Sequence, residues 1–195
     1  LQGELLNIHM QFSVLEAHRD SWRMVLVSLV DITARKKAEA YLEYLGKHDV
    51  LTRLRNRAFY TEELNRLSRR GPWPLSVVVI DLNGLKRIND EFGHAAGDAI
   101  LRRMGEVLSK AVDAPACAAR IGGDEFAVLL PGADERAAQA ALERIQSILT
   151  LNNQFYSGQT LSMSIGVATC ASADKVDAAL HQADQAKKKK KTRFY

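Results

Sequence analysis

Three carboxylates beside glycines and apolar segments form the most chemically suggestive pattern in the chain. Asp124 and Glu125 are adjacent and follow a Gly-Gly pair between two apolar segments, and Asp81 ends a third apolar segment. Adjacent carboxylates repel each other and need a cationic partner. Mg²⁺ prefers oxygen ligands and is usually held by one or two carboxylates together with substrate phosphates. The pattern therefore favours a Mg²⁺ site, and a solvated hairpin turn is the alternative.

A second polar stretch, residues 89–98, could recognise a nucleotide base. It begins with Asn89, contains Gly93 and Gly97, and ends with Asp98. Guanine presents adjacent N1–H and N2–H donors that suit a carboxylate, and a side-chain amide can bond the remaining polar edge atoms. The plainer alternative is a loop in which Asp98 caps the following helix. These residues alone leave both interpretations open.

Helices and strands mixed along the chain must position these side chains. Apolar periodicity predicts helices at 58–67, 98–112, 134–149 and from 176 onward, and strands at 75–81, 117–121, 125–130 and 161–169. The Gly-Gly-Asp between the second and third of these strands is a hairpin signal. The prediction is an α/β fold with a mixed central sheet, flanking helices and a β-hairpin that carries the acids.

The first third of the chain has a different organisation. Residues 5–17 and 22–33 read as two strands joined by a polar turn. Two strands alone are marginally stable in water, so we interpret them as the end of a larger sheet. A helix over 34–48, with Thr33 as its N-cap, carries a short coiled-coil seam. The alternative is one amphipathic helix that packs on its own domain.

Composition excludes several classes of protein. The chain has 195 residues, of which 47% are hydrophobic and 26% charged, as expected of a globular protein rather than a disordered chain or a disulfide scaffold. Its cysteines, Cys117 and Cys170, lie in apolar segments, so we expect buried thiols and a reducing, cytoplasmic setting. No apolar run approaches the roughly 18 residues that span a bilayer, which predicts no membrane segment.

The basic charge of the chain is concentrated at its end. The formal net charge is +4, from 27 Lys and Arg against 23 Asp and Glu. Residues 187–195 hold six of those cations, so 21 cations and 23 acids remain elsewhere, a net −2. Without interleaved aromatic residues, such a run is more typical of a solvated end than of a nucleic-acid surface, and we expect no nucleic-acid partner.

Residues 122–126, Gly-Gly-Asp-Glu-Phe, resemble the signature of the GGDEF family, the diguanylate cyclases. The agreement covers residues 49–195 in the order of the family's blocks, and includes Asp49-Val-Leu-Thr52, Asn56-Arg57, Asp81, Lys86, Asn89-Asp90, Gly93-His94, Gly97-Asp98, Ser164 to Ala168 and Ala183-Asp184. Residues 1–33 resemble the end of a PAS sensory domain, and 34–48 resemble the signalling helix that follows it. The resemblance thus implies an upstream sensor domain as a partner.

The resemblance implies a fold like that of nucleotidyl cyclases and polymerase palm domains. It also implies condensation of two GTP molecules into cyclic di-GMP with release of two pyrophosphates. Since one site holds one GTP, the reaction needs a homodimer. The resemblance assigns Asp81, Asp124 and the carbonyl of Leu82 to Mg²⁺ or Mn²⁺, and Glu125 to a further ligand position or to the 3′-hydroxyl. It assigns Asn89 and Asp98 to guanine recognition, and Gly122 and Gly123 to the close approach of the phosphates. It assigns Lys86 and Arg120 to the neutralisation of phosphate charge.

The sequence departs from the family at several positions. Members inhibited by their product carry Arg-x-x-Asp where this chain has Asp113-Ala-Pro-Ala116, which predicts no product inhibition through that site. Arg53 and Arg55 replace a usual Gly and Pro, and Asn83 stands where many members have a second Asp. Asn83 is therefore not expected to be a strong metal ligand.

The C-terminal lysine run is the largest departure. The family has a helical turn between its Ala-Asp and Ala-Lys pairs, whereas Ala183-Asp184-Gln185-Ala186 runs straight into five lysines. With a four-residue gap, Lys187 and Lys191 match the cations that contact the triphosphate; without it, Lys191 matches the first of them. This departure motivates an alternative function, in which the domain binds GTP without turnover and regulates a neighbour such as an EAL phosphodiesterase domain.

Overall fold

The computed structural model describes residues 5–156 and 158–192. The chain divides into two units, Leu1–Leu45 and Gly46–Tyr195. The second unit contains every residue that the sequence singles out for chemistry, and the first is described on its own.

The first unit consists of a β-hairpin and a helix. Strands β1 (Ile8–Val14) and β2 (Val25–Asp31) pair antiparallel, and helix α1 (Thr33–Lys47) follows them. The prediction that Thr33 caps this helix is wrong, because Thr33 is its first residue. The carboxylate of Asp31 accepts the N–H of Thr33 at 2.8 Å, and the hydroxyl of Thr33 accepts the N–H of Asn7 at 2.7 Å.

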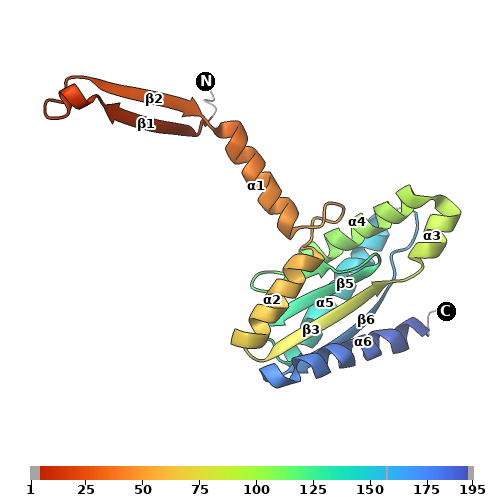
Figure 1. The fold of residues 1–195 in the computed structure, drawn as a ribbon. Helices are drawn as coiled ribbons and strands as arrows, with labels where there is room; N and C mark the ends of the chain where they lie inside the picture. The colour runs from red at the N-terminus through yellow and green to blue at the C-terminus, as the bar shows by residue number, and fades with distance from the viewer. Residues whose placement is uncertain (1–4, 157, 193–195) are drawn as a thin grey trace. The chain divides into compact units, whose positions relative to one another are not determined.

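The second unit is built on a sheet with the strand order β4-β5-β3-β6 in the described residues (Figure 1). Its strands are β3 (Leu75–Leu82), β4 (Cys117–Arg120), β5 (Glu125–Pro131) and β6 (Met163–Cys170). Its helices are α2 (Arg57–Arg70), α3 (Leu85–Phe92), α4 (His94–Ala111), α5 (Glu135–Phe155) and α6 (Val176–Thr192). The predicted α/β class and the hairpin between β4 and β5 are confirmed.

The structure also differs from the sequence predictions in detail. The sequence predicts a mixed sheet, but in the described residues the neighbouring strands of this sheet pair antiparallel. Parallel pairing occurs in an isolated bridge between Arg55 and Ala119. The helix expected from Asp98 begins at His94, because Gly93, at φ 83°, ends α3 and begins α4. Asp98 therefore lies inside α4 and is not a helix cap.

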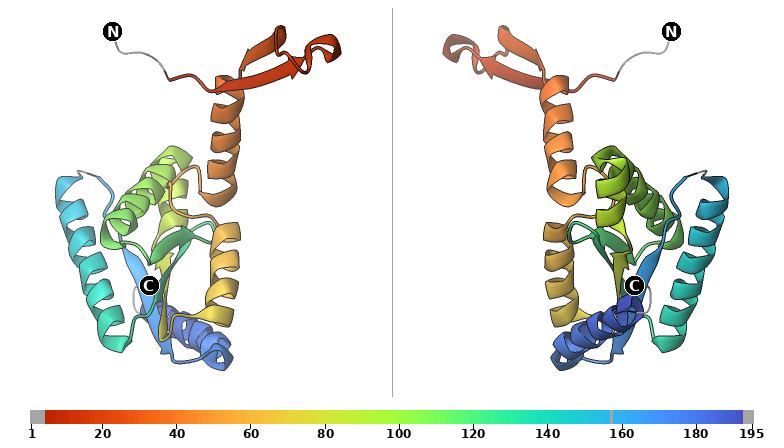
Figure 2. Two further views of the ribbon diagram at one scale, coloured as in Figure 1. Left: turned by 90° about the vertical axis from the view of Figure 1, so that its left-hand side faces the viewer. Right: turned by 90° about the vertical axis from the view of Figure 1, so that its right-hand side faces the viewer.

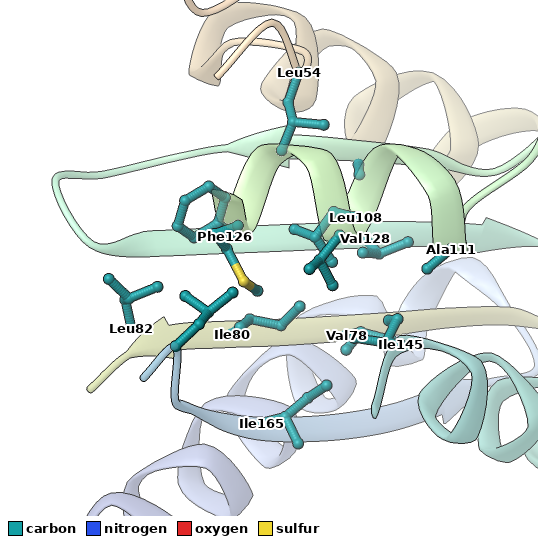
Figure 3. Packing of buried hydrophobic residues seen from close by; sticks show 14 of the residues in the cluster. Leu54, Val78, Ile80, Leu82, Leu108, Ala111, Phe126, Val128, Ile145 and Ile165 are labelled. Atoms are coloured by element: carbon teal, nitrogen blue, oxygen red, sulfur yellow. The ribbon is translucent and has the colours of Figure 1, made fainter. Parts of the chain in front are cut away.

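Helices cover both faces of the sheet, as Figure 2 shows. Side chains alternate across a strand, so alternate residues of β3 enter different cores. Val78, Ile80 and Leu82 pack with α4 and α5 (Figure 3), whereas Val77 and Val79 pack with α2 and α6. Burying one such aliphatic side chain contributes about 1.5–3 kcal/mol, so this alternation fixes which face each strand residue occupies.

The same alternation directs the acidic residues. Asp81 has the parity of Val77 and Val79, and it lies directly opposite Glu125 on β5. Both side chains therefore lie on the α6 face of the sheet. Gly166 on β6 lets α6 approach closely, since an added Cβ there would lie 2.0 Å from the carbonyl oxygen of Ala183.

Two further expectations can be compared with the structure. Cys117 and Cys170 are free thiols, and Cys170 is buried as expected, whereas Cys117 is only half-buried. No helix in the described part of the chain combines the length and the apolar character needed to cross a bilayer.

Candidate active site

The β4–β5 hairpin brings the predicted acids to one corner of the sheet. The N–H groups of Ile121 and Gly122 donate to the carbonyl of Glu125 at 2.9 and 3.2 Å and close the turn. The N–H of Leu82 donates to the carbonyl of Asp124 at 2.9 Å, which ties the turn to the end of β3. The four residues predicted for metal binding thus lie at the end of β3 and where the hairpin turn enters β5.

Two lysines of α6 reach this acidic corner. The Nζ of Lys187 lies 2.9 Å from Oε1 of Glu125 and 3.8 Å from Oδ2 of Asp81. The Nζ of Lys191 lies 2.5 Å from Oδ1 of Asp81 and 3.9 Å from Oδ2 of Asp124. Residues four apart on a helix lie on the same face, so the continuous helix α6 carries both ammonium groups to this corner. Lys187 and Lys191, the pair that the gapped alignment matches to the family's triphosphate-contacting cations, therefore reach the same carboxylate, that of Asp81.

Lys187 is the more deeply held of the two. Its side chain is 3% exposed, against 32% for Lys191. Burial alone would lower the pKa of Lys187, but hydrogen bonds to Glu125 and Asp184 and their negative charges outweigh it and raise the pKa. Lys187 therefore remains a cation inside the site.

The carboxylates of Asp81, Asp124 and Glu125, with the carbonyl of Leu82, form an oxygen donor set that fits Mg²⁺ or Mn²⁺. Among the described residues, no three acidic, His or Cys side chains are already grouped as a metal cage. The ammonium groups of Lys187 and Lys191 lie among the carboxylates instead. The donor chemistry fits, and the side chains would have to turn to use it.

The predicted base-recognition residues meet where α3 and α4 adjoin. Asn89 is half-buried in the last turns of α3, and its amide packs against Gly97 on α4, immediately before Asp98. An added Cβ on Gly97 would lie 1.9 Å from Oδ1 of Asn89. The carboxylate of Asp98 is half exposed and lies 3.7 Å from Arg102. Asn89 and Asp98 are thus neighbours with side chains accessible to a ligand.

Arg120 braces the hairpin in this structure. Its guanidinium donates to the carbonyl of Gly123 at 2.8 and 3.2 Å and to Asp49 at 3.3 and 3.4 Å. Asp49 in turn accepts the N–H and hydroxyl of Thr52 at 2.8 and 2.7 Å. Lys86 lies apart and is exposed on α3, where it lines a surface hollow with Arg87, Asp90 and Glu91.

Sequence reasoning assigned no site role to several residues that support the corner. Asp184 bonds Lys187 at 3.1 Å and Lys188 at 2.7 Å, and the bond to Lys188 is the main cause of its lowered pKa. The i,i+3 and i,i+4 spacings on a helix were a usable signal for these pairs. Asn83 is buried and bonds Ser162 at 3.1 Å and Ser164 at 2.8 Å, which no local pattern indicates.

At the position of the Arg-x-x-Asp motif, this chain has an acid, Asp113, that pairs with Arg144 of α5. Oδ2 of Asp113 accepts a hydrogen bond from Arg144 at 2.6 Å, and Arg144 also donates to the carbonyl of Lys110 at 3.1 Å. Asp113 thus stands where the motif has its arginine, and Ala116 stands where the motif has its aspartate.

The chain is similar to known proteins in both sequence and structure. The family described as "Diguanylate cyclase, GGDEF domain" matches residues 46–194. An uncharacterized protein of Mycobacterium tuberculosis is 36% identical over 177 residues, covering 88% of this chain and 28% of the relative. Diguanylate cyclase DgcS of Shewanella oneidensis is 35% identical over 140 residues, covering 70% of this chain and 47% of the relative.

Among solved structures, the GGDEF domain of TpbB (YfiN) from Pseudomonas aeruginosa superposes with a TM-score of 0.63 at 34% identity. The superposition covers 75% of this chain and 89% of that domain. The chain spans less than half the length of both curated relatives described above.

Proposed function

The chain belongs to the GGDEF family of diguanylate cyclases, and from that premise we propose that it condenses two GTP molecules into cyclic di-GMP and two pyrophosphates. The observation that carries the proposal is the acidic corner, where Asp81 on β3, Asp124 in the hairpin turn and Glu125 on β5 are faced by Lys187 and Lys191. Phosphoryl transfer needs positioning and charge stabilisation more than covalent work by the protein. Carboxylates opposed by ammonium groups can supply both.

Each half of the reaction exchanges one phosphorus–oxygen bond for another. The 3′-oxygen of one GTP bonds the α-phosphorus of the other, and the bond from that phosphorus to the bridging oxygen breaks, so pyrophosphate leaves with the bridging oxygen. We assign Glu125 to take the hydroxyl proton. Mg²⁺, or Mn²⁺ in its place, held by Asp81, the carbonyl of Leu82, Asp124 and Glu125, would neutralise phosphate charge and lower the pKa of the hydroxyl.

The remaining predicted residues bind and orient the nucleotide in this proposal. Asn89 and Asp98 take the guanine edge, and Gly122 and Gly123 admit the phosphates close to the turn. Gly123 has open space where a Cβ would be, in agreement with that role. The cations assigned to the phosphates are Lys86, Arg120, Lys187 and Lys191.

Two bonds between two nucleotides require two sites face to face, so the proposal includes a homodimer. The seam on helix 34–48 would set the pairing, and residues 1–33 would belong to a PAS-like sensor that controls it. Residues 49–195 form the cyclase domain in this scheme. We place the reaction in the cytoplasm, with no nucleic-acid partner.

The test is incubation of the protein with GTP and Mg²⁺ at several protein concentrations, followed by chromatography of the products. Cyclic di-GMP should form at a rate that rises faster than linearly with protein, and Asp124→Ala should abolish it. Stable GTP with no product would reject cyclase activity for this chain.

A second candidate function is GTP binding without turnover, in regulation of a neighbouring domain such as an EAL domain. The contacts of Lys187 and Lys191 with the metal-site carboxylates favour it, because the carboxylates must give up at least one ammonium partner before catalysis. Calorimetric GTP binding without cyclic di-GMP formation would select this function over the first.

A further inference from the structure

Two lysine ammonium groups occupy the place where the proposed function needs a divalent cation. Between them, Lys187 and Lys191 contact all three carboxylates at 2.5–3.9 Å. Asp81, the acid they share, is 8% exposed, so its charge has little water to stabilise it. A carboxylate this buried is stabilised by a paired cation, and the loss of that cation is costly.

Charge balance makes the two kinds of cation alternatives. The acids Asp81, Asp124 and Glu125 carry three negative charges, and the two amines carry two positive charges. If one lysine leaves and the other stays, a divalent cation in the vacated position brings the net charge of the site from −1 to zero. A lysine that bonds a triphosphate shares its three N–H donors and its charge between the phosphate oxygens and Asp81, so its bond to Asp81 weakens.

The two lysines differ in how easily they can leave. Lys187 is buried and also holds Asp184, one helical turn before it, at 3.1 Å. Lys191 is one-third exposed and lies near the end of the described helix. Lys191 is thus the member that can turn outward, and Lys187 stays as the fixed charge.

We propose that Lys191 is an internal counterion that holds Asp81 in the nucleotide-free protein and passes to the triphosphate only when a divalent cation takes its place. The inference rests on the proposed function, since it assumes that GTP binds at this corner. Without nucleotide, the released ammonium group returns to water; with nucleotide, it gains an anionic partner. Metal and nucleotide therefore bind cooperatively, each weakly alone.

The experiment measures Mn²⁺ binding from the electron paramagnetic resonance signal of free Mn²⁺, so it needs no turnover. The proteins are wild type, Lys191→Met, Lys191→Arg and Lys190→Met, each without and with α,β-methylene GTP. Lys190→Met removes the same charge from an exposed position in the same run and controls for long-range electrostatics. Urea unfolding of each variant checks that it folds.

Lys191→Met should bind Mn²⁺ alone about tenfold more tightly than wild type, the effect of about one lost ion pair. Lys191→Arg and Lys190→Met should stay within about twofold of wild type. The GTP analogue should tighten Mn²⁺ binding much more in wild type than in Lys191→Met.

Equal or weaker Mn²⁺ binding by Lys191→Met overturns the inference, as does an equal gain in Lys190→Met. Failure of Mn²⁺ to bind any of the proteins, with or without the analogue, overturns the proposed function as well. If Lys191→Met binds Mn²⁺ more tightly but the analogue changes Mn²⁺ binding in none of the proteins, the role of Lys191 as counterion to Asp81 is supported, whereas GTP recognition at this corner and the passage of Lys191 to the triphosphate are overturned. The two proposals therefore fail in distinguishable ways.

Discussion

The Nζ of Lys187 lies 2.9 Å from Oε1 of Glu125, although the residues are 62 positions apart in the chain. The contact exists because Glu125 shares a sheet face with Asp81, and because Gly166 lets α6 cross that face closely. It joins the last helix of the domain to the hairpin that carries the acids.

Removal of this lysine should destabilise the domain. Lys187→Met leaves Glu125 and buried Asp81 short of a positive charge, so we expect a loss of about 2 kcal/mol in the free energy of unfolding. Lys188→Met is the matched control, because Lys188 is exposed, and it should cost less than about 0.5 kcal/mol. Urea unfolding measures both, and equal values would show that the buried contact contributes nothing.

Gly97→Ala should impair GTP binding. The new methyl group would overlap the amide of Asn89 and turn it away from the position assigned to guanine recognition. Loss of about one hydrogen bond corresponds to an increase of about tenfold in the dissociation constant for GTP. Calorimetry measures it, with Gly46→Ala as control, since an added Cβ on Gly46 meets no atom within 4 Å. Unchanged GTP affinity would remove Asn89 from the proposed base site.

Arg103→Lys should destabilise the domain by about 2 kcal/mol. The guanidinium of Arg103 is buried and donates to Asn152, Asn153 and the carbonyl of Gln159 at 2.6–2.9 Å, a fork that an ammonium group cannot reproduce. Arg102→Lys, at the adjacent exposed position, should have almost no effect. Thermal or urea unfolding distinguishes the variants, and a small effect at 103 would mean that lysine satisfies these acceptors.

Asp49→Asn should reduce the dependence of stability on acid pH. Burial alone would raise the pKa of Asp49, but hydrogen bonds from Thr52 and the charge of Arg120 outweigh it and lower the pKa. Stability from this carboxylate is present above its unfolded pKa of about 3.9 and is lost as the pH falls through the lower folded value. The stability difference between wild type and variant should shrink as pH falls from about 5 to 2. A constant difference would contradict the lowered pKa.

Cyclic di-GMP at micromolar concentrations should not slow the proposed reaction. The site that binds product in inhibited members requires an arginine where this chain has Asp113, and Asp113 is paired with Arg144 at 2.6 Å. Initial rates over a series of product concentrations test this. Strong inhibition that disappears on substitution of residues 113–116 would show that the altered site still binds product.

The sequence by itself determined the family, the α/β class and the identity of the acids, because each follows from local pattern. Gly-Gly between apolar segments specifies a hairpin, and the nearly continuous apolar run within 75–81 specifies a buried strand. The sequence did not predict a helix boundary that depends on the conformation of a glycine. Gly93, at φ 83°, separates α3 from α4, so Asp98 lies inside a helix.

Only the tertiary structure decided what these residues face. No local pattern shows that Arg120 reaches Asp49 and the carbonyl of Gly123, or that Asn83 bonds Ser164 across two strands. The lysine run gave two alignments, but the approach of α6 to β6 at Gly166 and the helical repeat bring Lys187 and Lys191 to the same carboxylates. Contacts between distant segments depend on packing of the whole sheet, which local sequence does not encode.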